Sequence, residues 1–259
     1  MTLNSTRKGA VRATDIPSDV LDGLSRGVLS SLTLTECLAL DQAQLARSVL
    51  PQLTPSCLEE IEHAQELGIL KRMSTIGALL WRTLGEQGLI YCQAHQADTV
   101  RGWACFMIGA RTDLELSLRL DAMQTFADDM HFGVREWAWM ATRPHLVQDL
   151  PRAITLLQPW TEHPSERIRR FACEALRPRG VWCSHIAILK ETPDMALPIL
   201  TALRADPSTY VQDSVANWLN DAAKTQADWV RQLCKLWLQA SPQQQSTIRI
   251  CKRGMRNIA

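Results

Sequence analysis

One pattern of apolar and polar positions recurs along the C-terminal two-thirds of the chain. Its apolar residues stand at offsets 0, 3, 4, 7 and 8, which share one face of an α-helix at about 100° per residue. The third copy carries Ile168, Phe171, Ala172, Ala175 and Leu176 at these offsets. Four gapless copies and a weaker fifth begin at Val100, Val134, Ile168, Val211 and Ile248.

The spacing of the copies predicts the fold class. They begin 34, 34, 43 and 37 residues apart, a period typical of helical-pair solenoids. Apolar stretches at 153–157 and 196–203 supply partner helices, and Ser165 and Ser208 can cap the helices that follow them. An arginine after the first β-branched residue is a habit of HEAT-type repeats. We therefore predict an all-α superhelical solenoid of HEAT-like repeats over residues 91–259.

The N-terminal part is helical by pattern but has no clean copy of the repeat. Residues 16–90 show capping residues followed by apolar periodicity, which predicts a set of N-terminal helices. Residues 1–15 are basic and are expected to form a flexible arm. No linker rich in Gly, Ser or Pro interrupts the rest, so residues 16–259 are predicted to form a single domain.

Composition excludes several classes of function. With 28 Lys and Arg against 27 Asp and Glu the net charge is +1, so no overall field draws the chain to nucleic acid or membrane. The eight cysteines lack zinc-ligand spacing, and the P-loop, GxGxxG, GxSxG and HExxH patterns are absent. No apolar run approaches the ~18 residues of a membrane span. We expect reduced thiols, no metal, no membrane partner and a cytoplasmic location.

The offsets opposite the apolar face indicate a binding surface. Stacked helices would place offsets 2, 6 and 9 side by side, and these columns mix carboxylates, arginines and amides. An ordinary solvated face with pairs such as Arg170 and Glu174 is the alternative. The columns are Gly102, Glu136, Arg170 and Asp213; Phe106, Met140, Glu174 and Asn217; and Gly109, Arg143, Arg177 and Asn220.

Tryptophan and arginine positions refine this expectation. Trp218 occupies an apolar offset, where packing is the simpler explanation, whereas Trp139 points away from the apolar face and Trp182 follows a helix stop, in a loop that can contact a ligand. Residues 163–179 hold five Arg and two Glu, and residues 247–259 hold four basic residues and no acid. Such local basic charge fits a surface laid partly on phosphates, with an ordinary scatter of charge as the alternative.

Two segments resemble a known family. RRFACEALRPRGVW (169–182) and SVANWLNDAAK (214–224) are similar to segments of the AlkC/AlkD group of DNA alkylation-repair glycosylases, which are HEAT-like-repeat proteins, and the AlkC branch is the nearer one. The resemblance implies a DNA-alkylpurine N-glycosylase that excises cationic N-alkylated purines, of the 3-methyladenine or 7-methylguanine type, without a metal or nucleotide cofactor. It implies double-stranded DNA with alkylated bases as the partner, and a nucleoid-associated monomer is expected.

The resemblance also assigns roles to single residues. The carboxylate of the family's E-x-x-RPR-x-x-W motif corresponds to Glu174 and its aromatic residue to Trp182, while the carboxylate that ends SVANxLND corresponds to Asp221. Such carboxylates stabilise an oxocarbenium-like sugar, indole rings attract a cationic base, and arginines hold phosphates. The resulting candidates are Glu174, Asp221 and Glu136 as catalytic carboxylates, Trp182, Trp139 and Trp218 at the lesion, and Arg170, Arg177, Arg179 and Arg143 on the DNA backbone.

One position departs from the AlkC pattern and motivates an alternative. Four residues before Arg143, where AlkC-like proteins have a further carboxylate, this chain has Trp139, and Glu136 is the nearest acid. The alternative is a non-catalytic HEAT-like module that binds DNA structures or a protein partner. A pure protein scaffold would have no affinity for DNA.

Overall fold

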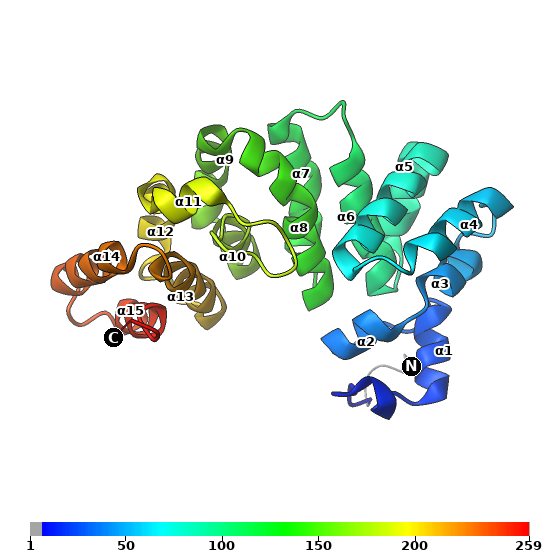
Figure 1. Cartoon of the computed structure of the whole chain (residues 1–259), viewed down its shortest axis with the longest axis horizontal. Helices are drawn as coiled ribbons and strands as arrows, with labels where there is room; N and C mark the ends of the chain where they lie inside the picture. Colours follow the sequence, from blue (N-terminus) through cyan, green and yellow to red (C-terminus); the bar gives the residue numbers. More distant parts are fainter. Residues whose placement is uncertain (1–6, 259) are drawn as a thin grey trace. The chain divides into compact units, whose positions relative to one another are not determined.

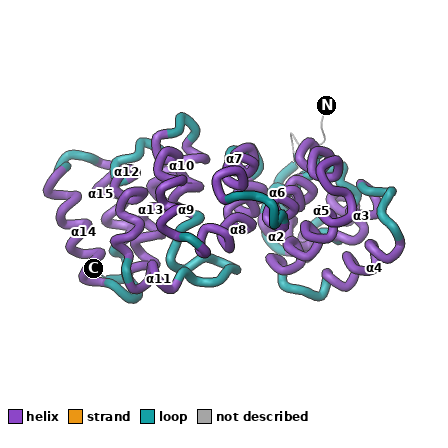
Figure 2. The backbone as a smooth tube through the Cα atoms, turned by 90° about the horizontal axis from the view of Figure 1, so that it is seen from above, coloured by secondary structure: helices purple, strands orange, loops and turns teal. Residues whose placement is uncertain are grey.

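The computed structural model describes residues 7–258, which form helices joined by loops, with no strand in that range (Figures 1 and 2). The all-α prediction is therefore confirmed. The chain divides into two compact units, Met1–Ala141 and Thr142–Ala259, and the boundary falls within the residues of helix α8 (Phe132–Gln148). The single domain expected over residues 16–259 stays a prediction.

The first unit contains the N-terminal helices and the first repeat. The copy that begins at Val100 lies on α6, and the copy that begins at Val134 lies on α8. The helices before α8 are α1 (Ser18–Ser25), α2 (Leu34–Ala39), α3 (Gln42–Val49), α4 (Pro55–Ala64), α5 (Ile69–Ala94), α6 (Asp98–Ala110) and α7 (Leu116–Ala127), with a 3-10 turn η2 at Ala13–Asp15.

Helices α5 and α6 pack closely because a glycine lies at their crossing. A Cβ atom on Gly77 of α5 would lie 2.7 Å from the carbonyl carbon of Phe106 on α6, so only hydrogen fits there. Beside this crossing, Trp103 is fully buried and its indole N–H donates to the buried Gln42 side chain at 3.0 Å. The crossing thus combines close backbone approach with a satisfied buried indole.

Residues 7–10 of the predicted flexible arm contact the rest of the first unit, whereas residues 11–15 are exposed. Arg7 donates to the Oε1 atom of Glu36 at 2.7 Å and to the carbonyl of Ser30 at 2.8 Å, and the amide of Ala10 donates to the same Glu36 carboxylate. Glu36 is completely buried, and a buried carboxylate requires a counter-charge and hydrogen bonds. That requirement anchors the segment, whereas residues 1–6 of the expected arm lie outside the described residues.

The second unit contains the last three copies, on α10, α13 and α15, and α13 packs against both of the others. Ser165 and Ser208 accept hydrogen bonds from backbone amides at the starts of α10 and α13, which confirms both predicted caps. The elements are α9 (Leu150–Leu157), η3 (Gln158–Glu162), α10 (Glu166–Glu174), α11 (Ala187–Glu191), η4 (Pro193–Ala196), α12 (Leu197–Leu203), α13 (Thr209–Ala223), α14 (Ala227–Ala240) and α15 (Gln245–Gly254).

The arginine at offset 1 of the repeat ties one copy to the start of the next. In the second unit, Arg169 donates hydrogen bonds to both carboxylate oxygens of Asp206, at 2.7 and 3.1 Å. In the first unit, Arg101 grips Asp129 with the same two distances. Each guanidinium also donates to two carbonyls just before its own helix. Paired, fork-like contacts of this kind fix orientation as well as distance.

Two expectations from the composition concern the cysteines and membrane-spanning helices. All eight cysteines, which lie within the described range, are free. Among the helices of residues 7–258, none has both the length and the hydropathy needed to cross a membrane.

The α5–α6 crossing generates a stability prediction. Gly77→Ala should lower the free energy of unfolding by about 1–3 kcal/mol, because the added methyl group overlaps backbone atoms that cannot move alone. Gly68→Ala is the matched control: no atom lies within 4 Å of a Cβ there. It should change the free energy by less than about 0.5 kcal/mol. Urea unfolding measures both, and equal effects would contradict the close crossing.

Candidate functional site

Two acids predicted to be catalytic share one guanidinium group. Glu174 ends α10, and Asp221 lies one repeat later on α13. Arg177 donates from Nη1 to Oε1 of Glu174 at 2.7 Å, and from Nε and Nη2 to Oδ2 of Asp221 at 2.9 and 2.7 Å. The structure therefore brings both carboxylates to a single cation.

The carboxylate of Glu174 is buried and ionised. Its residue is 4% exposed, and Oε2 accepts a hydrogen bond from the hydroxyl of Ser214 at 2.5 Å. Burial raises its pKa, but Arg170, whose Nη2 atom is 3.6 Å from Oε2, and Arg177 lower it, and the net pKa lies below the ordinary value. Glu174 therefore carries a negative charge at neutral pH despite its burial.

Asp221 faces a more open group on its other oxygen. Its Oδ1 atom lies 3.3 Å from the ammonium of Lys224, whose side chain is 49% exposed. Arg179 donates to the backbone carbonyl of Asp221 at 3.3 Å. The Asp221 side chain itself is only 6% exposed, so Lys224 covers one approach to this carboxylate.

Arg143, expected on the DNA backbone, is instead a buried structural side chain, 2% exposed. It donates to the carbonyls of Ala175 and Arg177 at 2.9 and 2.7 Å and to that of Ser184 at 3.1 Å. The carbonyls of Ala175 and Arg177 lie just beyond the C-terminal end of α10, where no later helical amide can donate to them, and Arg143 supplies the missing hydrogen bonds. A phosphate contact would require breaking them, so the expectation for Arg143 is corrected.

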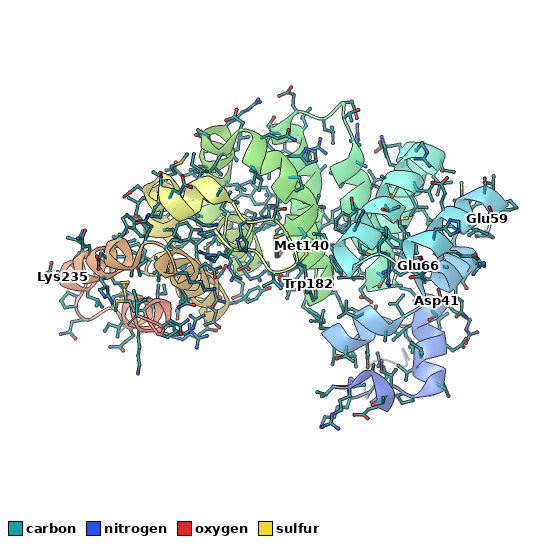
Figure 3. The ribbon with its side chains drawn as sticks, viewed as in Figure 1. Asp41, Glu59, Glu66, Met140, Trp182 and Lys235 are labelled. Carbon is teal, nitrogen blue, oxygen red and sulfur yellow. The ribbon has the colours of Figure 1, made fainter. Side chains whose placement is uncertain are left out.

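The predicted indoles lie in three different settings. Trp182, labelled in Figure 3, lies in the loop after α10, is 44% exposed and has a positive φ of 62°. Trp218 is completely buried, and its indole N–H donates to the carbonyl of Leu176 at 2.9 Å. Trp218 thus supports the turn that carries Arg177, whereas Trp182 is exposed enough to meet a ligand directly.

In the first unit, Trp139 and Glu136 contact each other. The indole N–H of Trp139 donates to Oε2 of Glu136 at 2.8 Å. Trp139 is 2% exposed, although its offset was expected to point away from the apolar face. A helix in a repeat array packs on more than one side, so position opposite the apolar face does not ensure exposure. The catalytic role of Glu136 stays a prediction.

Three side chains of this cluster escaped the sequence analysis. Ser214 binds Glu174, Lys224 faces Asp221, and Tyr210 lies beneath Arg170, whose guanidinium carbon is 4.5 Å from the ring centroid. Ser214 stands at offset 3 of its copy, where the three preceding copies have Trp or Phe. A hydroxyl at an offset that is otherwise aromatic could therefore have indicated a polar contact in the sequence. For Tyr210 and Lys224 the repeat pattern contains no such signal.

Comparisons with known proteins match the part of the chain that contains the candidate site. Residues 134–244 match the family model of DNA alkylation repair enzymes. A Bacillus subtilis protein, the uncharacterized YhaZ, is 43% identical over 102 residues, which span 39% of this chain and 29% of YhaZ. The chain therefore covers less than a third of that curated relative.

Solved structures share the fold. The Pseudomonas fluorescens alkylpurine DNA glycosylase AlkC, bound to DNA containing an abasic site analog, has a TM-score of 0.68 at 22% identity, over 96% of this chain and 65% of its own. AlkD2 from Streptococcus mutans has a TM-score of 0.53 at 21% identity, over 84% of this chain and 97% of its own. The predicted helical-repeat fold and the resemblance to AlkC/AlkD-like proteins are thereby confirmed.

The shared guanidinium generates a stability prediction with a pH dependence. Arg177→Met removes the guanidinium that two buried carboxylates share, and we expect a loss of about 3–5 kcal/mol near neutral pH. Lys224→Met, which removes an exposed partner of Asp221, should cost less than about 1 kcal/mol.

The sign of the pH dependence follows from Glu174. Its folded pKa lies below the ordinary 4.5, so its contribution is present above that value and is lost as pH falls through the folded pKa. Without Arg177, only Arg170 and the Ser214 hydroxyl oppose the effect of burial on the Glu174 pKa, so that pKa rises and acid relieves more of the charge. The stability gap between the wild-type protein and Arg177→Met should therefore shrink from about pH 7 to about pH 4 in urea unfolding. A gap that stays constant would contradict the shared pair.

Proposed function

We propose that this chain, whose residues 134–244 match the family model of DNA alkylation repair enzymes, is a DNA glycosylase that excises cationic N-alkylated purines from double-stranded DNA. One observation carries the proposal: two carboxylates from successive repeats, Glu174 and Asp221, meet on one guanidinium beside a turn that leads to an exposed indole.

The chemistry needs groups of this kind. An N-alkylated purine is already cationic, so its glycosidic bond breaks toward an oxocarbenium-like sugar. A fixed negative charge in a site of low dielectric constant stabilises that developing positive charge, and a carboxylate can also orient the attacking water. Glu174 meets the first requirement because its lowered pKa keeps it ionised.

Asp221 is as buried as Glu174, but the cation that covers its second oxygen is itself exposed. Its Oδ1 atom faces Lys224, whose half-exposed side chain forms a weak, screened pair and is displaced at little cost. A DNA phosphate would attract Lys224 and leave Oδ1 open toward the sugar. In this arrangement Asp221 holds water or faces the sugar, and Glu174 supports the charge from behind.

The neighbouring side chains suit a bound duplex. Trp182 offers an exposed ring for stacking on a cationic base. Arg170 and Arg179, both partly exposed, are the arginines of this cluster that can hold phosphate. Trp218 acts indirectly, since its contact with the Leu176 carbonyl supports the turn before Arg177.

A non-catalytic DNA-binding module is the second candidate. Two observations favour it: Arg177 already compensates both carboxylates, and Trp139 stands where AlkC-like proteins have a further acid. Such a module would bind DNA with strong salt dependence but release no base.

Base release from methylated duplex DNA tests the proposal. Glu174→Gln and Asp221→Asn, which keep shape but remove charge, should each slow release about 10²–10³-fold, the cost of removing one electrostatic group from a transition state. Chromatography of the released base measures the rate. Glu191→Gln, at the exposed end of α11, is the control and should leave the rate unchanged.

The outcomes separate the two candidates. Unfolding curves of each variant first establish that the chain is folded. Release by the wild-type protein that persists in both charge variants would contradict the assigned carboxylates. No release by the wild-type protein, together with salt-sensitive DNA binding, would favour the non-catalytic module.

The strained loop gives a prediction in which stability and activity diverge. Trp182→Gly should change the free energy of unfolding by less than about 1 kcal/mol, because glycine relieves the positive φ as the indole contacts are lost. The same change should slow base release about tenfold through the lost stacking surface. Trp182→Phe keeps an aromatic ring and should retain most of the rate; equal rates for both variants would exclude a stacking role.

A further inference from the structure

A row of arginines lies along the last repeat, outside the cluster around Arg177. Arg249 and Arg253 stand one turn apart on α15, and Arg256 follows in the turn after it. Arg249 donates to Oδ1 of Asp213 on α13 at 2.7 Å, and Arg253 lies 3.0 Å from the same oxygen. Arg256 donates to the side-chain carbonyl of Asn217 at 3.2 Å. We call these three residues the arginine row.

The arginine row is incompletely neutralised. Arg249 and Arg253 share a single carboxylate oxygen of Asp213. The side chain of Arg256 donates to the neutral amide of Asn217. The side chains of Arg249, Arg253 and Asp213 are 34, 47 and 41% exposed, so water and solutes reach them. A pair this exposed is weak and exchanges readily with another anion.

The arginine row contacts positions of α13 that are equivalent to those of the candidate site. Arg170, Glu174 and Arg177 occupy offsets 2, 6 and 9 of their copy on α10, and the same offsets on α13 are Asp213, Asn217 and Asn220. Because α13 packs between α10 and α15, its row of side chains stands between the carboxylate cluster and the arginine row. The amide of Asn257 also contacts Asn220, at 3.3 Å, which extends this contact by one more turn.

We propose that the arginine row is a second phosphate-binding surface, which holds the DNA backbone beyond the lesion, and that Asp213 restrains it by competing with phosphate for Arg249 and Arg253. This rests on the proposed function for its ligand, double-stranded DNA. The spacing is suitable: Arg249 and Arg253 are four residues apart, about 6 Å along the helix axis, which is close to two steps of about 3.4 Å along the axis of a DNA duplex.

The two parts of the proposal predict opposite changes in the affinity for DNA. Arg253→Gln with Arg256→Gln removes two phosphate contacts, whereas Asp213→Asn releases two guanidinium groups from their internal anion. A surface that only supports packing between α13 and α15 would be weakened by both changes and would gain affinity from neither.

Fluorescence anisotropy of the full chain with an undamaged DNA duplex, over a series of salt concentrations, measures both changes. The double arginine variant should reduce the slope of log K against log salt by about 2, at about 0.9 for each contact. Asp213→Asn should bind several-fold more tightly at low salt and show a steeper slope. Lys235→Gln, at a residue labelled in Figure 3, and Asp228→Asn are the matched controls for loss of a cation and of an acid, and both residues are exposed on α14.

The results distinguish this surface from the proposed catalytic site. Binding by the double arginine variant equal to that of Lys235→Gln, or binding by Asp213→Asn no tighter than that of Asp228→Asn, would overturn the arginine row. Absence of DNA binding by the wild-type chain would overturn it too. Base release that is insensitive to Glu174→Gln, alongside the expected slopes, would reject the catalytic proposal and leave the phosphate surface supported.

Discussion

Charged pairs that cross from one repeat to the next hold the second unit in register, and the candidate site depends on that register. Arg169 grips Asp206 at the start of α13, and Arg177 grips Asp221 near its end. The two contacts bracket most of the helix, so α13 can neither slide nor turn against α10 without breaking one of them. Under this constraint Glu174 and Asp221 reach the same cation.

The same arrangement keeps Glu174 ionised and buries both carboxylates. Arg170 and Arg177 keep Glu174 charged against the effect of burial, which an oxocarbenium-stabilising group requires. The guanidinium of Arg177 also compensates that charge until a substrate arrives. A duplex that brings phosphates to Lys224 and the neighbouring arginines changes the balance of charge around both carboxylates. The proposed function therefore couples catalysis and DNA binding through one small set of ion pairs.

One face of the repeat serves different purposes in successive copies. In the copy on α10 it carries the arginines and the acid of the candidate site. On α13 it carries Asp213 and Asn217, which contact the arginine row, and Asn220, which accepts a hydrogen bond from Asn257. Repeats stack with a constant offset, so equivalent positions form continuous rows. Small changes of residue type along such a row thus distinguish the proposed catalytic surface from the proposed phosphate-binding one without a change of fold.

The sequence by itself determined the helices, their period and two of their caps, since apolar periodicity and Ser165 or Ser208 act within a few residues of the chain. It also indicated Glu174 and Asp221 through local motifs. Only the tertiary structure decided that Arg143 and Trp139 are buried and that Arg7 anchors the N-terminal segment to Glu36. Those outcomes depend on contacts between residues far apart in the chain, which no local pattern records. The sharing of Arg177 by two acids 47 residues apart, Glu174 and Asp221, is of the same kind.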